Sequence, residues 1–367
     1  MSRFSTIWRF LLLAVVLTAC GRAVTLDIAQ PAATSMPQVE MTVPVTSMPT
    51  STPPPTPTPS PVATATPEPP PTSTASSTPP PTATLTQTPA PTATPLPALP
   101  PNRLGSVLVL EYHMIREPEG RWQRTPANFR ADMERLHAQG YIPANIIDLT
   151  LGLPDVPAGR KPVVLTFDDS DISQFRYLDD GSLDPDSAVG ILVEMHQKYA
   201  ADWPLKGTFY VLQDVDAPER ILFGQTDYQD QKLQWLVAQG FEVGSHTISH
   251  FDLTAGSAEQ VQWQLAVSQW QLEARLPGYD VRSLSLPFGN YPLNEALLAR
   301  GVWAGQDYTY ASVVMVAGGA AVSPHNSEFN PYHIPRVQAL QSELDTWLDY
   351  FAQNSQLYYV SPGPETD

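Results

Sequence analysis

Two adjacent carboxylates and two histidines are the residues of this sequence with the clearest capacity for chemistry. Asp168 and Asp169 directly follow the apolar run 163–167, and His246 and His250 lie further along the chain. Adjacent carboxylates repel each other, and burying an unpaired charge is costly, so the pair needs a partner. Two imidazoles and one carboxylate, with positions left for water, are the ligand pattern of a catalytic zinc or a similar divalent ion. We therefore predict a divalent metal site, most consistent with zinc, with Asp169, His246 and His250 as its ligands.

The chemistry of such a site is hydrolysis. A bound divalent ion lowers the pKa of water and polarises a carbonyl oxygen, and Asp168 stays available as the general base toward that water. His246 and His250 are four residues apart, so on one helical turn both rings would project to the same side. Satisfied surface histidines are the commoner explanation of such a pair alone. The aspartate pair and the histidine pair together favour a catalytic site.

The elements that must position these residues alternate between strand and helix after Leu104. Strands are expected at 107–113, 146–149, 163–167, 206–212, 241–244, 284–289, 302–305, 310–316 and 332–337, and helices at 129–138, 188–199, 231–238, 258–276, 293–300 and 342–353. This alternation predicts an α/β fold with a parallel sheet covered by helices. About seven strand–helix units would curl the sheet into a barrel or near-barrel, with its chemistry at the carboxyl ends of the strands.

The first residues resemble a bacterial lipoprotein leader. Two arginines precede the apolar run 10–17, which is too short to span a bilayer but suits a signal-peptide core. Leu-Thr-Ala-Cys at residues 17–20 resembles the lipobox, in which the cysteine is lipidated; an ordinary signal peptide that contains a cysteine is the alternative. Cys20 is the only cysteine, which excludes an intrachain disulfide and a cysteine-cluster metal site. We expect a signal peptide over residues 1–20 and a membrane anchor on Cys20.

Residues 21–103 form a linker of low complexity. It holds 23 of the 40 prolines, with many threonines and serines and almost no charge. Such a composition cannot bury an apolar core and predicts a disordered, extended spacer. The spacer is either a mere tether or a stalk that carries O-linked sugar. Anchor, spacer and a catalytic domain over residues 104–360 would together display the domain outside the bacterial membrane, facing the cell wall, or in secreted form.

The formal charge of −17 belongs to the part of the chain after the linker. Residues 1–100 carry three acidic and three basic side chains, which cancel. An acidic domain disfavours nucleic acid and anionic polymers as partners and suits a neutral or cationic ligand. We expect a monomer with no nucleic-acid partner.

Three motifs together resemble a known family. They are Thr-Phe-Asp-Asp at 166–169, Ser-His-Thr-Ile-Ser-His at 245–250 and Leu-Pro-Phe-Gly at 286–289. They look like the first three motifs of the NodB-homology polysaccharide deacetylases, carbohydrate esterase family 4, and the resemblance covers residues 107–337. It implies a deformed (β/α) barrel, a divalent metal that is often zinc, and hydrolysis of N-acetyl groups from N-acetylglucosamine polymers or O-acetyl groups from xylan.

The resemblance also implies roles for single residues. Asp168 would be the base, and Asp169, His246 and His250 would hold the metal. The backbone N–H of Phe288 would donate a hydrogen bond to the developing oxyanion, a role that requires only the main chain.

Two positions depart from the family pattern. Members often have an arginine four residues before the glycine of the third motif, where it orients the base, and here that position is Ser285. Many also have a glycine after the aspartate pair, where this chain has Ser170. Arg336 could supply the missing cation.

The resemblance also implies a general acid, the late histidine of the family's fifth motif, which is not obvious in this chain. His113 ends the expected strand 107–113 and resembles the Leu-x-x-His end of that motif moved to the front, an order seen in some extracellular members that act on poly-N-acetylglucosamine. We hypothesise that His113 is the acid; an imidazole merely hydrogen-bonded at a strand end is the alternative. His325 and His333 are the other candidates.

Several aromatic side chains could line a sugar groove, although each alone is more often part of a core. They are Trp122, Phe175, Tyr177, Phe223, Tyr291 and Trp303.

These observations predict a metal-dependent hydrolase that acts on the carbon–nitrogen (non-peptide) bonds of an acetylated cell-envelope or extracellular polysaccharide. Ser285 leaves open a non-catalytic glycan-binding protein on a degenerate deacetylase scaffold. An amidohydrolase acting on a small amide is the third alternative.

Overall fold

The structure is a computed structural model that describes residues 98–364. The predicted signal peptide, the lipid anchor on Cys20 and most of the linker lie outside the described residues. Between residues 98 and 364, no helix has the length and hydropathy that crossing a membrane requires.

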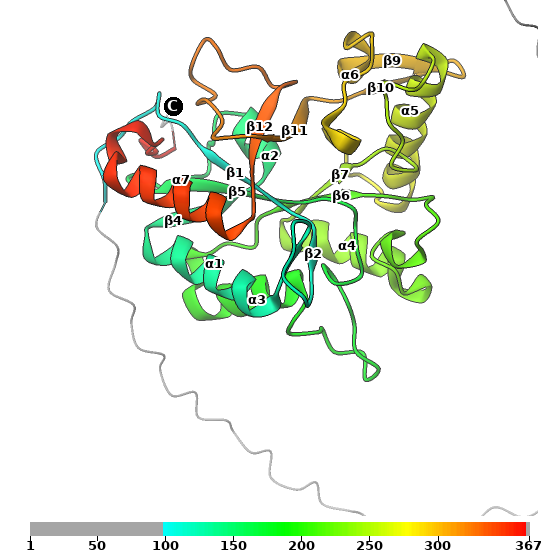
Figure 1. Ribbon diagram of the computed structural model, residues 1–367. Coiled ribbons are helices and arrows are strands. Elements are labelled where there is room, and N and C mark those ends of the chain that lie inside the picture. The colour runs from blue at the N-terminus through cyan, green and yellow to red at the C-terminus, as the bar shows by residue number, and fades with distance from the viewer. Residues whose placement is uncertain (1–97, 365–367) are drawn as a thin grey trace, which may run out of the picture. The chain divides into compact units, whose positions relative to one another are not determined.

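A closed ring of parallel strands forms the centre of the molecule (Figure 1). The strands are β1 (Leu108–Tyr112), β5 (Lys161–Phe167), β6 (Thr208–Val211), β7 (Glu242–Ser245), β8 (Ser283–Ser285), β11 (Ser312–Gly318) and β12 (Ile334–Gln338). Each strand pairs with the next in this order, and β12 pairs with β1 to close the ring. The predicted (β/α) barrel of about seven units is confirmed.

The barrel is deformed beside β5. Strand β4 (Tyr141–Ala144) pairs with the first half of β5, and β6 pairs only with Thr166 and Phe167 at its end. Both neighbours therefore share one edge of β5, while β1 pairs with residues 163–167 along its other edge. The last residues of β5 are thus held between β1 and β6, which fixes the direction in which the chain leaves toward Asp168.

Strand β5 is buried on both faces because one side faces the barrel interior and the other faces the helices. All seven of its residues are buried, as expected of a parallel strand made of a continuous apolar run. The Phe167 ring stacks on Phe209 of β6 at 4.5 Å and on Tyr112 of β1 at 5.6 Å between centroids. These aromatic contacts join the three strands just below their carboxyl ends.

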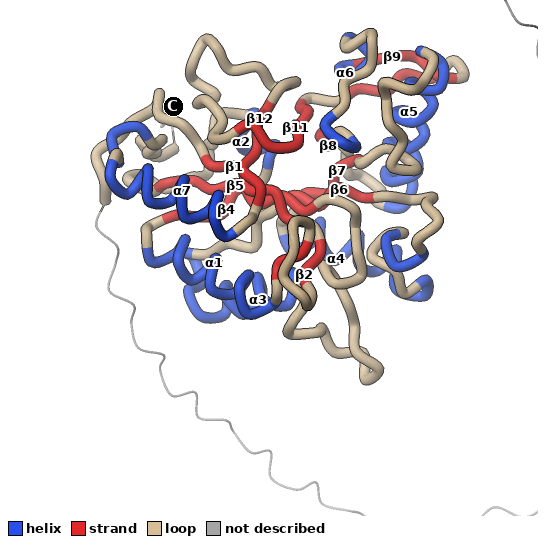
Figure 2. The backbone as a smooth tube through the Cα atoms, in the orientation of Figure 1, coloured by secondary structure: helices blue, strands red, loops and turns tan. Residues whose placement is uncertain are grey.

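Helices cover the outside of the barrel (Figure 2). They are α1 (Pro126–Ala138), α2 (Ile146–Thr150), α3 (Ala188–Tyr199), α4 (Gln229–Gln239), α5 (Ala258–Arg275), α6 (Ala296–Ala299) and α7 (Gln341–Gln353). Short 3-10 turns are η1 (Ala200–Asp202), η2 (Pro218–Arg220), η3 (Thr226–Tyr228), η4 (Pro287–Gly289) and η5 (Ser355–Leu357). Helix α1 begins as its sequence indicates, because Thr125 Oγ1 accepts the N–H of Asn128 and Pro126 occupies the first position.

Some predicted elements are wrong in kind or extent. Residues 146–149 belong to helix α2, whose start is stabilised by Asp148 accepting the N–H of Asn145, and the strand of this region is β4 just before it. Short apolar runs do not distinguish strand from helix, which explains the error. The predicted helix 293–300 is reduced to the single turn α6.

Two small strand pairs lie outside the barrel and were not predicted. Strands β9 (Arg300–Trp303) and β10 (Gln306–Thr309) pair antiparallel where the sequence suggested one strand at 302–305. Strands β2 (Met114–Ile115) and β3 (Gln123–Arg124) pair parallel after β1. Because β2 begins directly after β1, this pair lies at the carboxyl end of that barrel strand.

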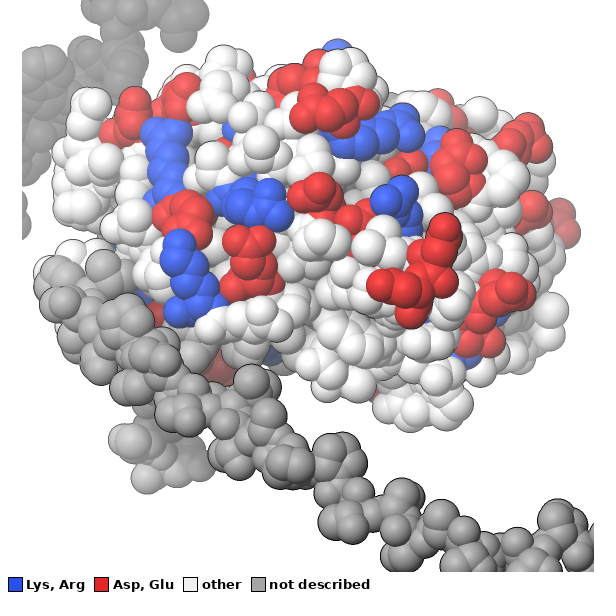
Figure 3. Space-filling view, turned by 90° about the horizontal axis from the view of Figure 1, so that it is seen from below, with Lys and Arg blue, Asp and Glu red and all other residues white. Residues whose placement is uncertain are grey.

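Charges of both signs are interspersed on the face that Figure 3 shows, the side on which α1 and α3 lie in Figure 1. Arg130 of α1 pairs with Glu194 of α3 at 2.9 Å, and Lys198 of α3 pairs with Glu134 of α1 at 2.7 Å. Exposed pairs of this kind contribute little to stability. On this face, side chains of opposite charge within residues 98–364 thus lie next to one another.

Candidate active site

A cavity of about 450 Å³ lies at the carboxyl ends of the barrel strands, where chemistry was expected. It is lined by His113, Met114, Arg121, Trp122, Asp168, Asp169, Arg220, His246, His250, Leu286, Phe288 and Val316. All six residues predicted to do chemistry are in this set. The barrel thus brings together residues that are up to 175 positions apart, the separation of His113 and Phe288.

Asp169, His246 and His250 form a compact cluster of possible metal ligands. Asp169 Oδ1 lies 3.4 Å from His246 Nε2 and 3.4 Å from His250 Nε2. His246 Nδ1 lies 2.9 Å from the carbonyl oxygen of Ser285, and because a carbonyl only accepts, Nδ1 must carry the hydrogen. Nε2 is then left with its lone pair toward Asp169, the arrangement that metal-binding histidines show. One carboxylate and two imidazoles so arranged fit a divalent ion such as zinc.

The two histidines lie on a tight turn after β7, so the predicted helical turn is wrong. Thr247 and His250 have φ angles of 65° and 55°, in the left-handed region that side chains rarely adopt. Gln264 of α5 holds the turn by accepting the N–H of Ile248 at 3.0 Å. The ring centroids of His246 and His250 are 4.9 Å apart. Strained backbone that brings two ligands together is characteristic of functional sites.

The protonation states of His250 and Asp169 also suit the binding of a metal ion. Burial, with the neighbouring His246, lowers the pKa of His250 to about 4, so its imidazole is neutral at pH 7. Burial alone would raise the pKa of Asp169, but His246, His113 and Arg220 hold it below the usual range. For His246, burial lowers the pKa, yet the charges of Asp168 and Asp169 raise it overall. The same two carboxylates would attract a metal cation bound between them and the imidazoles.

Asp168 is held by the side chain of Arg336 from β12. Arg336 Nη1 donates to Asp168 Oδ1 at 2.8 Å, and Nη2 donates to Oδ2 at 2.7 Å. Ser285 Oγ donates to Oδ2 at 2.9 Å, and all three side chains are buried. Burial alone would raise the pKa of Asp168, but the Arg336 charge lowers it and keeps the carboxylate ionised. Arg336 therefore supplies the cation that members of the family often carry at the position of Ser285.

His113 lies beside the same carboxylate at the end of β1. A ring nitrogen of His113 and oxygens of Glu111 and Asp168 lie within 4.8 Å of one another, and His113 is 12% exposed. The other candidate acids lie elsewhere: His325 Nε2 contacts the carbonyl of Gly152 at 3.2 Å, and His333 Nε2 contacts a carboxylate of Glu295 at 2.9 Å. Of the late histidines and His113, only His113 lines the cavity.

Phe288 lies in the turn η4 that follows β8. Its φ is 60°, and its ring is 61% exposed and packs edge-on against His250 at 4.6 Å. A large apolar side chain that is mostly exposed and strained is costly to maintain without a role. Its position at the cavity is consistent with the backbone role predicted for it.

Two basic residues of the cavity, Arg220 and Arg121, were missed by the analysis of chemistry in the sequence. Arg220, in η2, places Nη2 2.5 Å from Asp169 Oδ1. Ser170, where the family often has glycine, donates from Oγ to the carbonyl of Arg220 at 2.6 Å and so ties this loop to the aspartate pair. Arg121 lies beside Trp122, which was among the candidate sugar-groove aromatics and does line the cavity. No motif marks these loop positions.

The other candidate aromatics do not line the cavity. Phe175 and Phe223 are fully buried in the core, Tyr291 stacks on His333, and Trp303 lies on β9. Tyr177 lines a different depression beside Arg176 and Gln225. Burial of these rings reflects core packing, which composition alone does not distinguish from a sugar platform.

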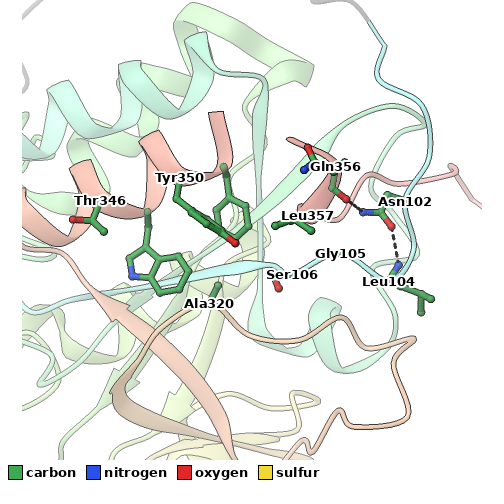
Figure 4. A pocket seen from close by; sticks show the side chains of 11 residues that line it. Asn102, Leu104, Gly105, Ser106, Ala320, Thr346, Tyr350, Gln356 and Leu357 are labelled. Atoms are coloured by element: carbon green, nitrogen blue, oxygen red, sulfur yellow. Dashed lines mark hydrogen bonds between the residues drawn. The ribbon is translucent and has the colours of Figure 1, made fainter. Parts of the chain in front are cut away.

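A second cavity, of about 600 Å³, lies between α7 and the segment that precedes β1 (Figure 4). Tyr350, Trp347 and Leu357 form much of its wall, and it contains no charged side chain. It holds none of the residues that acid–base or metal chemistry needs, so we place the catalytic chemistry in the first cavity.

Comparison with known proteins agrees with the motifs. Residues 155–301 match the model of the polysaccharide deacetylase family, while a search of curated proteins found no match. Among solved structures, the polysaccharide deacetylase BC0361 from Bacillus cereus is 20% identical with a TM-score of 0.49, covering 69% of each chain. Streptococcus pyogenes deacetylase PplD in complex with acetate is 19% identical with a TM-score of 0.47, covering 68% of this chain and 98% of that one. IcaB from Ammonifex degensii is 20% identical with a TM-score of 0.47, covering 68% and 97%.

The matched segment contains the aspartate pair, the histidine pair and Phe288, but not His113 or Arg336. The last two come from the strands that close the barrel on either side of it. Residues 155–301 are therefore similar to the polysaccharide deacetylase family, a family of hydrolases.

Proposed function

We propose that this protein removes acetyl groups from an acetylated polysaccharide of the bacterial cell envelope or surroundings by metal-dependent hydrolysis. The observation that carries the proposal is the adjacency of two differently bound carboxylates. Asp169 faces two imidazoles, whereas Asp168 is held by Arg336 and Ser285. Acid–base hydrolysis at a metal site requires this division between a ligand and a base.

Asp169, His246 and His250 would hold the metal, with zinc as the ion that suits the donor set best. When bound, a divalent ion there would increase the acidity of water and polarise the acetyl carbonyl. The three side chains follow the ends of β5 and β7, two strands that β6 joins, so the rigid barrel maintains their relative positions.

Asp168 is the residue that would take a proton from the attacking water. It must be ionised to do so, and its bidentate bond with Arg336 maintains that state. The same bond fixes the orientation of the carboxylate. Arg336 also donates to the carbonyl of Met315 and to Thr166 Oγ1, so the guanidinium itself cannot rotate away.

His113 would give a proton to the departing amine, and the backbone N–H of Phe288 would stabilise the negative charge that develops on the carbonyl oxygen. Leu286 and Val316 add apolar surface to the same cavity, which suits the methyl group of an acetyl. Every group that hydrolysis of an acetamide requires therefore lies around one cavity.

The alternative of a non-catalytic glycan-binding protein rested on Ser285. Arg336 now supplies the cation that Ser285 lacks, and Ser285 itself binds the base. The geometry thus favours an active enzyme. We further propose that a lipid on Cys20 attaches the protein to the bacterial membrane, with the proline-rich linker carrying the domain toward the cell wall.

Acetate release tests the function directly. The intact protein is incubated with oligomers of N-acetylglucosamine, with and without a chelator, and zinc is then restored to the chelated sample. We expect acetate that disappears with chelator and returns with zinc. Release of acetate from a small amide such as N-acetylglucosamine itself, but not from oligomers, would favour the small-amide alternative. No chelator-sensitive acetate from any acetylated glycan would favour a binding protein.

A further inference from the structure

The loop between β2 and β3 brings two unassigned residues, Arg121 and Trp122, to the cavity. Trp122 is 36% exposed, and its ring centroid lies 4.6 Å from that of His113. Arg121 is exposed, and its Cζ lies 4.8 Å from the centroid of the Trp122 ring. The Trp122 ring thus contacts both His113, at the proposed reacting centre, and Arg121.

Arg121 differs from the other basic side chains of the cavity in its partners. Arg336 is bound to Asp168, and Arg220 is bound to Asp169. None of the ion pairs formed within residues 98–364 involves Arg121, whose contact is the face of Trp122. A cation–π contact positions a guanidinium without using its N–H groups. Arg121 therefore has donors free to bind a ligand in the cavity.

The chemistry that a free guanidinium recognises best is a carboxylate, which it can bind through two parallel hydrogen bonds. We propose that Arg121 selects acetylated glycans that carry a carboxylate on the sugar next to the one that loses its acetyl group. This selectivity rests on the deacetylase function proposed above. Arg121 is exposed and contacts Trp122, whereas the scissile amide would lie at His113 and Asp168, so we assign the charge that Arg121 recognises to the neighbouring sugar.

The local charge here opposes the net charge of −17, which by itself favours a neutral or cationic ligand. Charges beyond about 8 Å are largely screened at physiological salt. A group in contact with Arg121 therefore responds to Arg121 before it responds to the acidic surface elsewhere. The specificity of a site is set by its nearest groups, and the net charge mainly affects the approach of the polymer.

A matched pair of substrates tests this selectivity. One is a hexamer in which N-acetylglucosamine alternates with a uronic acid, and the other is the same hexamer with its carboxylates reduced to alcohols. For the intact protein we expect kcat/KM about tenfold higher on the acidic hexamer, mainly through KM, with the ratio falling as salt is added. Arg121→Gln should bring the ratio close to one, and Arg121→Lys should retain part of it. Arg300→Gln, an exposed arginine on β9 outside the cavity, serves as the control and should retain the full ratio.

Equal kcat/KM values on the two hexamers for the wild-type protein would overturn the selectivity, as would a ratio that Arg121→Gln leaves unchanged. Acetate from the reduced hexamer shows that the deacetylase function stands even if the selectivity fails. If neither hexamer releases acetate, the affinity of the intact protein for each hexamer, measured by calorimetry, tests the selectivity instead. Tighter binding of the acidic hexamer that Arg121→Gln abolishes supports the proposal, and equal binding refutes it.

Discussion

At the scale of single residues, Arg336 is the group that keeps Asp168, the proposed base, ionised and in place. Its guanidinium is fully buried and lies 2.7 Å from Asp168 and 3.5 Å from Glu111. Arg336→Met leaves two buried carboxylates without their cation, so we expect a loss of about 3–5 kcal/mol in the free energy of unfolding. Ser285→Ala removes one hydrogen bond to the same carboxylate and should cost only about 1 kcal/mol. Urea unfolding of both variants measures the difference; similar losses for the two would show that the ion pair does not stabilise the fold.

Arg220 is expected to oppose metal binding, because its Nη2 lies 2.5 Å from the oxygen of Asp169 that faces both histidines. Removing a like charge this close should raise the affinity for a divalent ion, about tenfold for Arg220→Met. Competition of the metal-free protein with a chromogenic zinc chelator measures the affinity without reference to turnover. Arg300→Met is the matched control. An unchanged or weaker affinity in Arg220→Met would mean that the arginine supports the site.

At the scale of elements, helix α4 controls a strained segment beside the site. Leu222, Phe223, Gly224 and Gln225 all have positive φ angles, between 49° and 64°. Lys232 of α4 is fully buried and donates from Nζ to the carbonyl of Phe223 at 2.7 Å. The segment follows η2, so α4 helps to determine where Arg220 lies. Strain of this kind persists only where the surrounding structure over-determines it.

Lys232 also predicts how stability depends on pH. Burial lowers its pKa to about 7, against about 10.4 in an unfolded chain. Between these values the unfolded state binds a proton that the folded state lacks, so the free energy of unfolding should rise with pH, by up to about 1.4 kcal/mol per pH unit from this group. Lys161, whose pKa burial lowers to about 8, contributes in the same direction. Urea titrations from pH 7 to 10 should show a smaller rise in Lys232→Met than in wild type; equal slopes would mean that Lys232 stays charged in the fold.

The elements that sequence predicts well are those in which one local pattern decides the outcome. The apolar run before Asp168 was correctly predicted as a buried strand because it is rich in β-branched and aromatic residues, and the motifs at the ends of β5, β7 and β8 contain the proposed ligands and the proposed base. The segment of helix α2 was predicted as a strand because a run of four residues fits both the helix period and the strand period. Arg121 and Arg220 were missed because they lie in loops without a motif, and only the closure of the barrel brings them to the cavity. Arg336 was recognised as a candidate cation from its chemistry, but its contact with Asp168 depends on β12 lying beside β1.

At the scale of the whole molecule, the barrel is closed by pairings between residues that are far apart in sequence. Strand β1 pairs with β12, where Leu110 lies opposite Val337, and also with β5. Two residues of the candidate site lie outside the matched segment: His113 directly follows β1, and Arg336 lies on β12. The site is therefore complete only when the ring is closed. Contacts of such high sequence separation form late in folding, so the local motifs alone do not assemble the site.

Because the site is complete only in the closed barrel, we expect metal binding and the stability of the whole domain to be coupled. Asp169 and His246 are brought together by β5 and β7, and an unfolded chain has no preformed site, so a divalent ion binds the folded state in preference. At a free zinc concentration of about 1,000 times Kd the gain is about 4 kcal/mol, which raises Tm by several degrees. We expect zinc to raise Tm of the intact protein, chelator to reverse the shift, and His246→Ala to abolish it. His333→Ala, outside the cavity, should retain the full shift. A zinc-induced shift that survives His246→Ala would place the stabilising ion elsewhere on the molecule, and the ligand assignment at the end of β7 would then be wrong.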